Sequence, residues 1–457
     1  MFYINDDYYT SDYVAQRHLE FRRSDALANN RRLAVCLEDA AQWIALCLFI
    51  KEQGGSVMPI HPSTPLDAAK RMATRAGCEQ LHFKEISNII QLESPAVGVE
   101  SPAAGVESRN QPDGVLIQMS SGTTGEPKCI ERSWATIDEE IQSYCSAFTQ
   151  PNDMMPLIAC PVTHSYGLIC GVLVALARGQ QPIVITNINP KYLAKRLLST
   201  QKPLLYTSPT MLHGLIRLLP KDRNIHAAMT SGTIMPKQRF EQLAPRIDHF
   251  FQQYGCSEAG CIAINPNMTL AMDVGIPLPH LDVVAGDSAD NPAEIVVTTK
   301  QGQQIHTQDL GHFRYDAAID GNMLSFLSRL DDTIIVAGLN VYPQEVEDVI
   351  LTMPDINDAV VFKIEDPYAG QRVCVQYSAD TPVEPSLIRQ WCADRLAPFQ
   401  LPQLLIQVEQ VDRLANGKVN RKQLAIQFAN QQRENRPAQI EPVAQNMAPE
   451  KTDTAAV

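Results

Sequence analysis

At 457 residues the chain is too long for one ordinary domain, and its length indicates two or three. An apolar content of 45% suffices for large cores, no apolar run is long enough to span a membrane, and a net charge of −13 argues against a nucleic-acid partner. The eleven cysteines form no C-x-x-C pair, which excludes a disulfide framework or a zinc site and indicates buried thiols in a reducing compartment. Because no signal-peptide core opens the chain, we expect a cytoplasmic protein.

Strand patterns alternate with helical patterns over the first two thirds of the chain. We predict strands at residues 32–38, 57–60, 114–119, 157–160, 182–185, 204–206, 227–231 and 249–254, and helices at residues 40–53, 67–76 and 191–198. This alternation is typical of a parallel α/β sheet, in which ligands gather at the carboxyl ends of the strands. Two short β patterns, at residues 294–298 and 323–327, suit a smaller β subdomain.

The pattern changes after Arg329. We predict a compact α+β unit with strands at residues 333–337, 359–363 and 373–377 and helices at residues 343–351 and 385–396. From about residue 431 the chain has no apolar period, so we expect a disordered tail. Residues 93–108 contain two copies of a seven-residue unit, E-S-P-A-V-G-V and E-S-P-A-A-G-V, which we interpret as a mobile surface loop.

A run of hydroxyl side chains and glycines follows the predicted strand at residues 114–119. It reads M-S-S-G-T-T-G-E-P-K from Met119 to Lys128, and its glycines let the backbone turn tightly and approach a ligand. Amides and hydroxyls together form a concave donor surface that suits phosphate. The spacing does not match the Walker pattern G-x-x-x-x-G-K-[ST], which argues against a P-loop ATPase. On its own, the run also fits a polar surface turn.

Four other polar stretches are candidates for a site. They are Y-G-C-S-E at residues 254–258, T-Q-D at 307–309 with Arg314 close behind, R-L-D-D at 329–332, and N-G-K at 416–418. Each alone also fits a plainer explanation. Y-G-C-S-E could be an ordinary strand end, T-Q-D and R-L-D-D could be solvated charges, and N-G-K could be a surface turn. Cys256 and Cys261 we interpret as packing residues.

In their order and spacing these motifs resemble the adenylate-forming superfamily, which includes acyl-CoA synthetases, the adenylation domains of nonribosomal peptide synthesis, and luciferases. The resemblance runs from about Arg32 to Leu424. It implies an α/β fold with four parts: an N-terminal adenylation core of α/β sheets plus a small β subdomain (residues 1–328), a hinge (329–332), a small mobile α+β lid domain (333–427) and a disordered tail (428–457).

The resemblance also implies the chemistry and its cofactors, ATP and Mg²⁺. A carboxylate attacks the α-phosphate of ATP, giving acyl-AMP and pyrophosphate, and a thiol then displaces AMP. The protein contributes positioning and charge stabilisation.

Individual roles follow from the matching positions. The phosphates of ATP would be held by Ser120, Ser121, Gly122, Thr123, Thr124, Gly125 and Lys128. The adenine, α-phosphate and ribose would be held by Tyr254, Gly255, Ser257, Asp309 and Arg329, and Glu258 would ligate Mg²⁺. Lys418 would neutralise charge between the carboxylate and the α-phosphate, and His164 would be a second catalytic residue. Asp331 would be the hinge, and Gly338 would lie beside the thiol channel.

Three positions depart from the family's pattern. Gln308 and Ser328 stand where glycine is usual, and Asn420 replaces a common aspartate. None of these changes removes a charged catalytic group, so we expect an active enzyme.

The acid is expected to be small. Residues 161–167 (P-V-T-H-S-Y-G) match the start of the family's acyl pocket, with Ser165 where amino-acid-activating relatives have an aspartate. The other positions that the resemblance places in the pocket are Tyr166, Tyr206, Met229, Ser231, Gly232, Gln253 and Cys261. The bulky side chains among them leave room for glycine, β-alanine or another short acid, whereas an extended chain would clash.

Three functions stay open. The first is a stand-alone enzyme that adenylates a small acid such as glycine and loads it onto the phosphopantetheine thiol of a separate carrier protein, as the glycine-activating enzymes of lipid A modification do. The alternative is an aryl- or acyl-CoA ligase. The third, a nucleotide-binding regulatory protein without chemistry, is disfavoured because Glu258 and Lys418 are both present.

Overall fold

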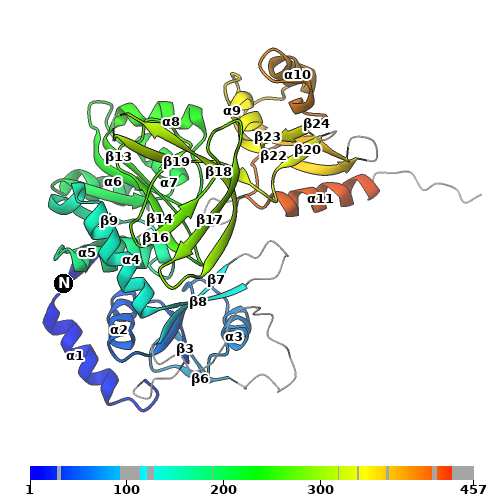
Figure 1. The fold of residues 1–457 in the computed structure, drawn as a ribbon. Coiled ribbons are helices and arrows are strands. Elements are labelled where there is room, and N and C mark those ends of the chain that lie inside the picture. The colour runs from blue at the N-terminus through cyan, green and yellow to red at the C-terminus, as the bar shows by residue number, and fades with distance from the viewer. Residues whose placement is uncertain are drawn as a thin grey trace, which may run out of the picture.

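The computed structural model consists of a large N-terminal body and a small C-terminal domain that lies against one side of it (Figure 1). The structure describes residues 1–27, 32–92, 114–120, 128–187, 189–317, 319–336, 339–366, 370–413 and 419–434. The predicted loop at residues 93–108 lies outside these ranges.

A six-stranded sheet forms one part of the body, in the order β6-β5-β3-β4-β7-β8. Its central strand is fully apolar from Leu33 to Leu37 because both faces of the sheet are covered, by α2 (Ala40–Glu52) and α3 (Leu66–Arg75). Asp39 begins α2 by accepting hydrogen bonds from the Ala41 and Gln42 amides. The strands are β3 (Arg32–Leu37), β4 (Ser56–Pro59), β5 (Gln80–Lys84), β6 (Ile89–Gln91), β7 (Val115–Ser120) and β8 (Lys128–Ser133).

A second sheet runs through thirteen strands of the described chain, in the order β16-β17-β18-β19-β15-β14-β13-β12-β11-β9-β10-β1-β2. The parallel strands are β1 (Phe2–Ile4), β9 (Met155–Ile158), β10 (Ile183–Val184), β11 (Pro203–Thr207), β12 (Ile225–Thr230) and β13 (Ile247–Cys256). The antiparallel strands are β2 (Asp7–Tyr9), β14 (Gly260–Asn265), β15 (Asp273–Pro277), β16 (Leu281–Val284), β17 (Ala293–Thr299), β18 (Gln304–Asp316) and β19 (Gly321–Arg329). The strands that we expected in a separate small β subdomain, β17 and β19, belong to the same sheet as the parallel strands. They are connected to those strands through β15 and β14.

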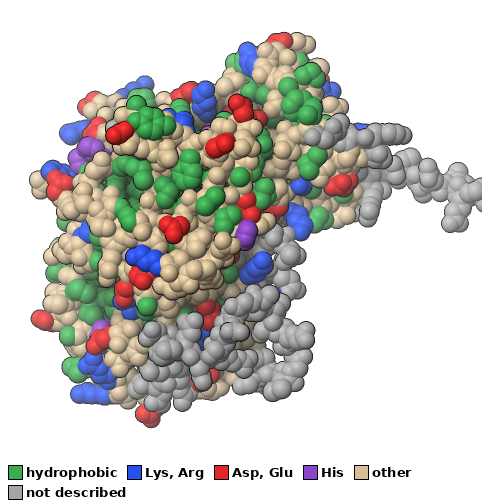
Figure 2. All heavy atoms as spheres, viewed as in Figure 1, with side chains coloured by type: hydrophobic (Ala, Val, Ile, Leu, Met, Phe, Trp, Pro, Cys, Tyr) green, Lys and Arg blue, Asp and Glu red, His purple; other side chains and the backbone are tan. Residues whose placement is uncertain are grey.

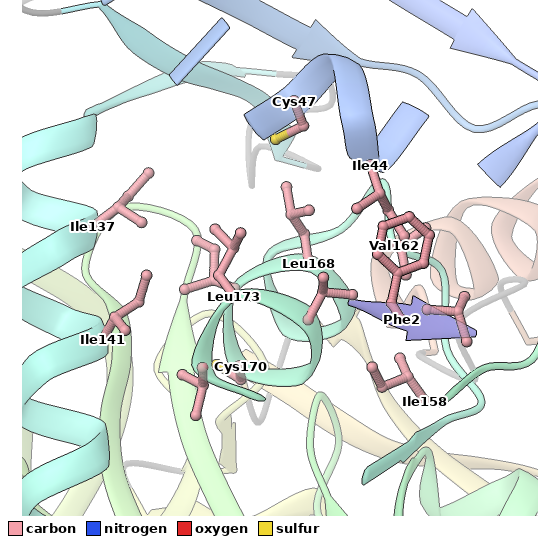
Figure 3. Packing of buried hydrophobic residues seen from close by; sticks show 14 of the residues in the cluster. Phe2, Ile44, Cys47, Ile137, Ile141, Ile158, Val162, Leu168, Cys170 and Leu173 are labelled. Carbon is pink, nitrogen blue, oxygen red and sulfur yellow. The ribbon is translucent and has the colours of Figure 1, made fainter. Parts of the chain in front are cut away.

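The core between the two sheets is filled by α2 and by helices of the second sheet. In Figure 3, Ile137 and Ile141 of α4 (Trp134–Ala147) face η2, a π-helix at Tyr166–Leu173, and Leu168 lies on the side of η2 that faces α2. The other helices of the body are α1 (Ser11–Arg22), η1 (Gln150–Asp153), α5 (Val174–Ala177), α6 (Pro190–Ser199), α7 (Pro209–Ile216), α8 (Lys237–Leu243) and η3 (Ala244–Arg246). The hairpin of β1 and β2 and helix α1 were not predicted from the sequence.

The small domain is built on a sheet of five strands among the described residues, in the order β21-β20-β23-β22 with β24 beside β23. Its strands are β20 (Ile334–Val336), β21 (Leu339–Val341), β22 (Ile356–Asp366), β23 (Gly370–Ala379) and β24 (Leu404–Val408). Its helices are α9 (Pro343–Leu351), α10 (Pro385–Ala393), η4 (Pro398–Gln400) and α11 (Arg421–Glu434). The predicted start of the disordered tail at residue 428 was wrong, because α11 continues to Glu434. Leu424 and Phe428 of α11 pack on Phe362 of β22, which stabilises the helix.

The two domains touch at helices α8 and α9 (Figure 1). The Lys237 amide at the start of α8 donates to Asp348 Oδ1 of α9 at 3.1 Å, so the small domain supplies the carboxylate that caps this helix. Arg239 of α8 lies 3.4 Å from Asp358, which also pairs with Arg413 at 2.8 Å. These contacts join the two domains through charged side chains.

In the described ranges, no helix is both long and apolar enough to cross a bilayer. On the face seen in Figure 2, acidic and basic side chains are interspersed.

All eleven cysteines are free, and most are buried. Burial raises the pKa of Cys47, Cys78, Cys256 and Cys374 to about 12, and that of Cys36 and Cys392 to about 11. We therefore expect iodoacetamide at pH 8 to label these thiols at least about a hundredfold more slowly in the native protein than in urea, since the thiolate is the reactive form. Mass spectrometry of peptides after timed labelling measures this. Equal rates with and without urea would contradict the buried, protonated state.

Candidate active site

The carboxyl ends of parallel strands bring several of the predicted residues together. Tyr206 of β11 pairs with Met229 of β12, and Met229 pairs with Phe251 of β13, so the three strands end along one edge. Ser231 and Gly232 follow β12 directly, and Gly232 has a φ of 92° that favours glycine. Beyond these, β13 carries Gln253, Tyr254 and Gly255 and leads into the turn with Ser257 and Glu258, whose side chain is exposed.

The predicted phosphate run lies between β7 and β8. Ser120 is the last residue of β7 and pairs with Lys128, the first residue of β8. The hairpin therefore holds both ends of the run in adjacent strands, and Lys128 is exposed. Ser121, Gly122, Thr123, Thr124 and Gly125 lie outside the described residues.

A hydrogen-bonded group connects the Y-G-C-S-E, T-Q-D and R-L-D-D motifs. The Tyr254 hydroxyl donates to Asp309 Oδ2 at 2.7 Å, and Arg329 Nη1 donates to Asp309 Oδ1 at 3.0 Å. Thr307 Oγ1 accepts the Asp309 amide at 3.1 Å. Burial and the neighbouring Asp309 raise the pKa of Tyr254 well above its usual range, so Tyr254 remains a donor. Asp309 is buried, and the interpretation of these charges as solvated is therefore wrong for it.

The backbone at Gln308 explains one departure from the family's pattern. Gln308 has a φ of 61°, a conformation that costs a non-glycine residue about 1–2 kcal/mol, and glycine would adopt it freely. Glu294 of the adjacent strand holds Gln308 there, because its Oε1 accepts from both the Gln308 amide (3.0 Å) and the side-chain Nε2 (2.9 Å).

The third departure, Asn420, also has a structural role. Its side-chain Oδ1 accepts the Gln423 amide at 3.0 Å in the first turn of α11. Asparagine caps a helix about as well as aspartate, so the replacement keeps the cap.

The predicted hinge adjoins the Asp309 group. Arg329 Nε pairs with Asp331 at 3.2 Å, and Asp331 is exposed. The next residue, Asp332, pairs with Arg421 of α11 at 3.1 Å. Gly338 and Lys418 lie outside the described residues.

The predicted acyl-pocket residues surround the first turn of η2. The Tyr166 hydroxyl donates to the Met229 carbonyl at 2.6 Å, and its ring lies 5.9 Å from that of Tyr206. Ser165 hydrogen-bonds to Gln118 of β7, while His164 is exposed on the loop before η2. The structure thus brings Ser165, Tyr166, Tyr206 and Met229 together, whereas it leaves His164 at the surface.

Helix η2 lies in close contact with the preceding loop and with β9. A Cβ at Gly167 would collide with the Pro161 carbonyl, and one at Gly171 would crowd Ile158 of β9. Two glycines four residues apart let the helix approach the Pro161 backbone and the Ile158 side chain closely. π-Helices of this kind are frequent at functional sites.

Sequence reasoning missed a buried polar network behind this pocket. Glu140 and Tyr144 of α4 are 1% and 0% exposed, and Glu140 pairs with Arg132 of β8 at 2.6 Å. Tyr144 donates to Gln253 Oε1 at 3.0 Å. A signal was present, because Glu140 falls between Ile137 and Ile141 on the apolar face of its helix.

The Arg132–Glu140 pair lies against the start of β14. Glu140 Oε1 accepts the Cys261 amide at 2.8 Å. Gly260 has a φ of 77°, and a Cβ there would collide with both Arg132 Nη1 and Glu140 Oε2. Cys261 is 2% exposed, which agrees with its interpretation as a packing residue.

The parallel sheet, the hairpin with the Ser/Thr/Gly run and the small α+β domain define a class, namely a two-domain α/β enzyme that acts on a nucleotide. Comparison with known families identifies it further. The chain matches the AMP-binding enzyme family over residues 23–302 and the C-terminal domain of AMP-binding enzymes over residues 345–418. It therefore belongs to the AMP-binding enzymes and is an adenylate-forming ligase that uses ATP, which confirms the resemblance seen in the sequence.

Two relatives bear on the acid and the acceptor. The chain is 37% identical over 421 residues to a 3,4-dihydroxybenzoate–[aryl-carrier protein] ligase of Bacillus anthracis, covering 92% of this chain and 97% of the relative. It is 26% identical over 340 residues to a putative long chain fatty acid–CoA ligase, VraA, of Staphylococcus epidermidis, covering 69% and 72%.

Two solved structures share the fold. ATP-bound MatB from Rhodopseudomonas palustris superposes with a TM-score of 0.74 at 19% identity, covering 91% of this chain and 92% of that one. The o-succinylbenzoate CoA synthetase of Bacillus subtilis with its acyl-adenylate gives 0.74 at 19% identity, covering 92% and 94%. The two-domain α/β fold expected from the sequence is confirmed.

The close approach at Gly260 gives a stability prediction. Gly260→Ala should lower the free energy of unfolding by about 2–5 kcal/mol, because it adds backbone strain and displaces a buried ion pair. Gly179→Ala is the matched control, since Gly179 has a similar φ of 74° but no atom within 4 Å of the added methyl group. Urea denaturation of both variants measures the difference. Equal losses would show that the Arg132–Glu140 pair is not tightly packed there.

Proposed function

We propose that the chain adenylates a hydroxylated aromatic acid and passes the acyl group to the phosphopantetheine thiol of a separate carrier protein. The observation that carries this proposal is the 37% identity, over 92% of the chain, to a relative named for 3,4-dihydroxybenzoate and an aryl-carrier protein. Glycine, the example of a small acid drawn from the sequence, has no support among these relatives.

The geometry of the pocket residues supports a flat ring. The rings of Tyr166 and Tyr206 lie 5.9 Å apart and 55° from coplanar, and aromatic rings favour such tilted neighbours. The Tyr166 hydroxyl is occupied by the Met229 carbonyl. What Tyr166 offers a substrate is therefore its ring face, which suits an aryl acid.

ATP would be bound at the edge formed by the ends of β7 and β13. Tyr254 would pack on adenine, with Gly255 beside it and Ser257 on the α-phosphate. Asp309 would accept from the ribose hydroxyls, because Tyr254 and Arg329 hold its carboxylate in place beside the end of β13. Ser120–Gly125 and Lys128 would hold the outer phosphates.

Glu258 fits the proposed Mg²⁺ site. Among the described residues, no three His, Cys, Asp or Glu side chains gather into a metal cage. Mg²⁺ at nucleotides is usually held by one or two carboxylates, by waters and by the phosphates themselves, so one exposed carboxylate beside Ser257 suffices. The ion would neutralise phosphate charge.

The reaction would proceed in two displacements. In the first, a carboxylate oxygen of the acid attacks the α-phosphorus and pyrophosphate leaves, with Lys418 offsetting the negative charge that accumulates. In the second, the carrier thiolate attacks the acyl carbon, and AMP leaves with the oxygen that had joined its phosphate to the acyl group. The chain contributes alignment and fixed charge. His164, exposed on the loop before η2, would be a second catalytic residue beside the predicted acyl pocket.

Coenzyme A is the second candidate acceptor. The relative VraA is named as a CoA ligase, and the same acyl-adenylate can be attacked by either thiol. The greater identity and coverage of the aryl-carrier-protein ligase favour the carrier protein.

ATP–pyrophosphate exchange tests the acid. With the purified protein we expect exchange with 3,4-dihydroxybenzoate to exceed that with benzoate, and exchange with glycine, β-alanine and octanoate to stay near background. Exchange with glycine alone would overturn the proposal. The acceptor is tested by adding CoA or a phosphopantetheinylated aryl-carrier protein to the loaded enzyme and measuring thioester by mass spectrometry.

Lys418 is tested by substitution. Lys418→Ala should lower pyrophosphate exchange by about a hundredfold or more, because it removes a charge positioned for the transition state. Transfer from chemically prepared acyl-AMP should persist, since Lys418 acts in the first step only. Lys422→Ala is the matched control, with the same change four residues further on an exposed face of α11. Near-normal exchange by Lys418→Ala would refute the assignment.

A further inference from the structure

Two carboxylates of the small domain reach across to helix α8 of the large body. Asp348 of α9 accepts the Lys237 amide at 3.1 Å, and Asp358 of β22 lies 3.4 Å from Arg239. Both contacts lie where the two domains meet (Figure 1). Helix α8 begins after Pro236, which supplies no side-chain cap, so its first-turn amide depends on a partner from outside its own helix.

The charges in these contacts are partly shielded from water. The side chains of Arg239 and Asp358 are only 20% and 19% exposed. Burial raises the pKa of Asp348 and lowers the pKa of Arg239, because each charge gives up solvent where the domains meet. A pair of this kind contributes more than a fully exposed pair, and dissolved salt still weakens it.

Each of the two carboxylates keeps a second partner inside the small domain. Asp358 forms a bidentate pair with Arg413, at 3.0 and 2.8 Å. The oxygen of Asp348 that faces α8 also accepts from Gln344 Nε2 at 3.0 Å. If the domains separated, neither carboxylate would lose its last partner, and the groups on α8 would gain water. The contact can therefore open without leaving a buried charge unpaired, which is what makes most buried pairs costly to break.

Helix α9 is joined to the chain segment that follows Lys418. Glu347 of α9 accepts from Arg421 of α11 at 2.7 Å. Arg421 also bonds Asp332, directly after the predicted hinge, at 3.1 Å. Because Arg421 follows Lys418 by three residues, a contact that holds α9 on the large body also holds the start of the helix to which Lys418 is connected.

We propose that α8, Asp348 and Asp358 form an electrostatic latch that holds the small domain in place for the first displacement. Arg239 and Asp348 are then positioning residues, because they act on the reaction through the placement of α9 and α11. Opening of the latch would let the small domain turn at Asp331 for the second displacement. This inference rests on the proposed function, because it uses the two displacements and the assignment of Lys418 to the first.

The ratio of two rates reports the state of the latch. If each displacement needs its own arrangement of the domains, the rate of acyl transfer divided by the rate of pyrophosphate exchange follows the equilibrium between the open and latched forms. Opening the latch raises this ratio whichever form is more populated. A loss of folded protein would instead lower both rates together and leave the ratio unchanged.

Charge reversal at Arg239 is the first test. Arg239→Glu places a like charge against Asp358, so we expect the ratio of transfer from prepared acyl-AMP to ATP–pyrophosphate exchange to rise by about tenfold. Raising NaCl from about 50 to about 500 mM should raise the ratio in the unmodified enzyme and change it less in the variant, because salt screens the pair. Arg217→Glu is the matched control, since it makes the same charge change at the exposed C-cap of the neighbouring helix α7.

Hydrogen exchange tests the latch without turnover. In Asp348→Ala the amide hydrogens in the first turn of α8 should exchange about tenfold faster, because the Lys237 amide loses its acceptor. Asp348→Asn keeps an acceptor oxygen and should keep most of the protection. If Arg239→Glu fails to fold in a thermal melt, Arg239→Gln replaces it, because it removes the charge without adding an opposite one.

Three outcomes would overturn the proposal. They are an unchanged ratio in Arg239→Glu, an equal rise in Arg217→Glu, and equal protection of α8 in Asp348→Ala and the unmodified protein. Failure of the proposed function looks different, because the unmodified enzyme would then show no exchange with any aryl acid. Hydrogen exchange in α8 would still decide whether the latch exists.

Discussion

The buried ion pair between Arg132 and Glu140 joins the two large sheets of the body. Arg132 belongs to β8 of the six-stranded sheet, and the same Glu140 carboxylate accepts the Cys261 amide of β14 in the thirteen-stranded sheet. One side chain of α4 therefore fixes two sheets relative to each other. Removing one partner of such a buried pair typically lowers the free energy of unfolding by about 3–5 kcal/mol, because the other charge stays buried without a partner or water. Gly260 is required beside the pair because no larger residue fits.

The proposed nucleotide site and the proposed hinge share a second arginine. Arg329 bonds Asp309 on one side and Asp331 on the other, at 3.0 and 3.2 Å. Asp309 is buried, whereas the Asp331 pair is largely exposed and therefore weak. Rotation of the small domain about Asp331 would break the weak bond and leave the strong one, so the ribose contact would survive. The same rotation would have to release Asp348 from the start of α8.

Sequence reasoning succeeded where the signal is local. Helix α9 was predicted at its observed bounds, Pro343–Leu351, because a proline and acidic residues mark its start and its apolar face is periodic. Glu140 was missed because a charged residue within a helix usually faces solvent, and only its tertiary partners, Arg132 and the Cys261 amide, make burial possible. Gln308 was noted as a departure, yet the reason that it is tolerated lies fourteen residues away in Glu294.

The expectation of a small acid rested on side-chain volume, and volume does not decide how much space a residue leaves. Tyr206 and Met229 are buried in the core between the sheets, where they pack against Phe251 and its neighbours, and Tyr166 is drawn toward the strand by the Met229 carbonyl. A large side chain held in this way can form the wall of a flat pocket without filling it. The amide of Gln253 contacts Tyr144 of α4 at one end and Cys170 of η2 at the other. Its orientation therefore depends on residues of other elements, which residue type at the predicted pocket positions could not reveal.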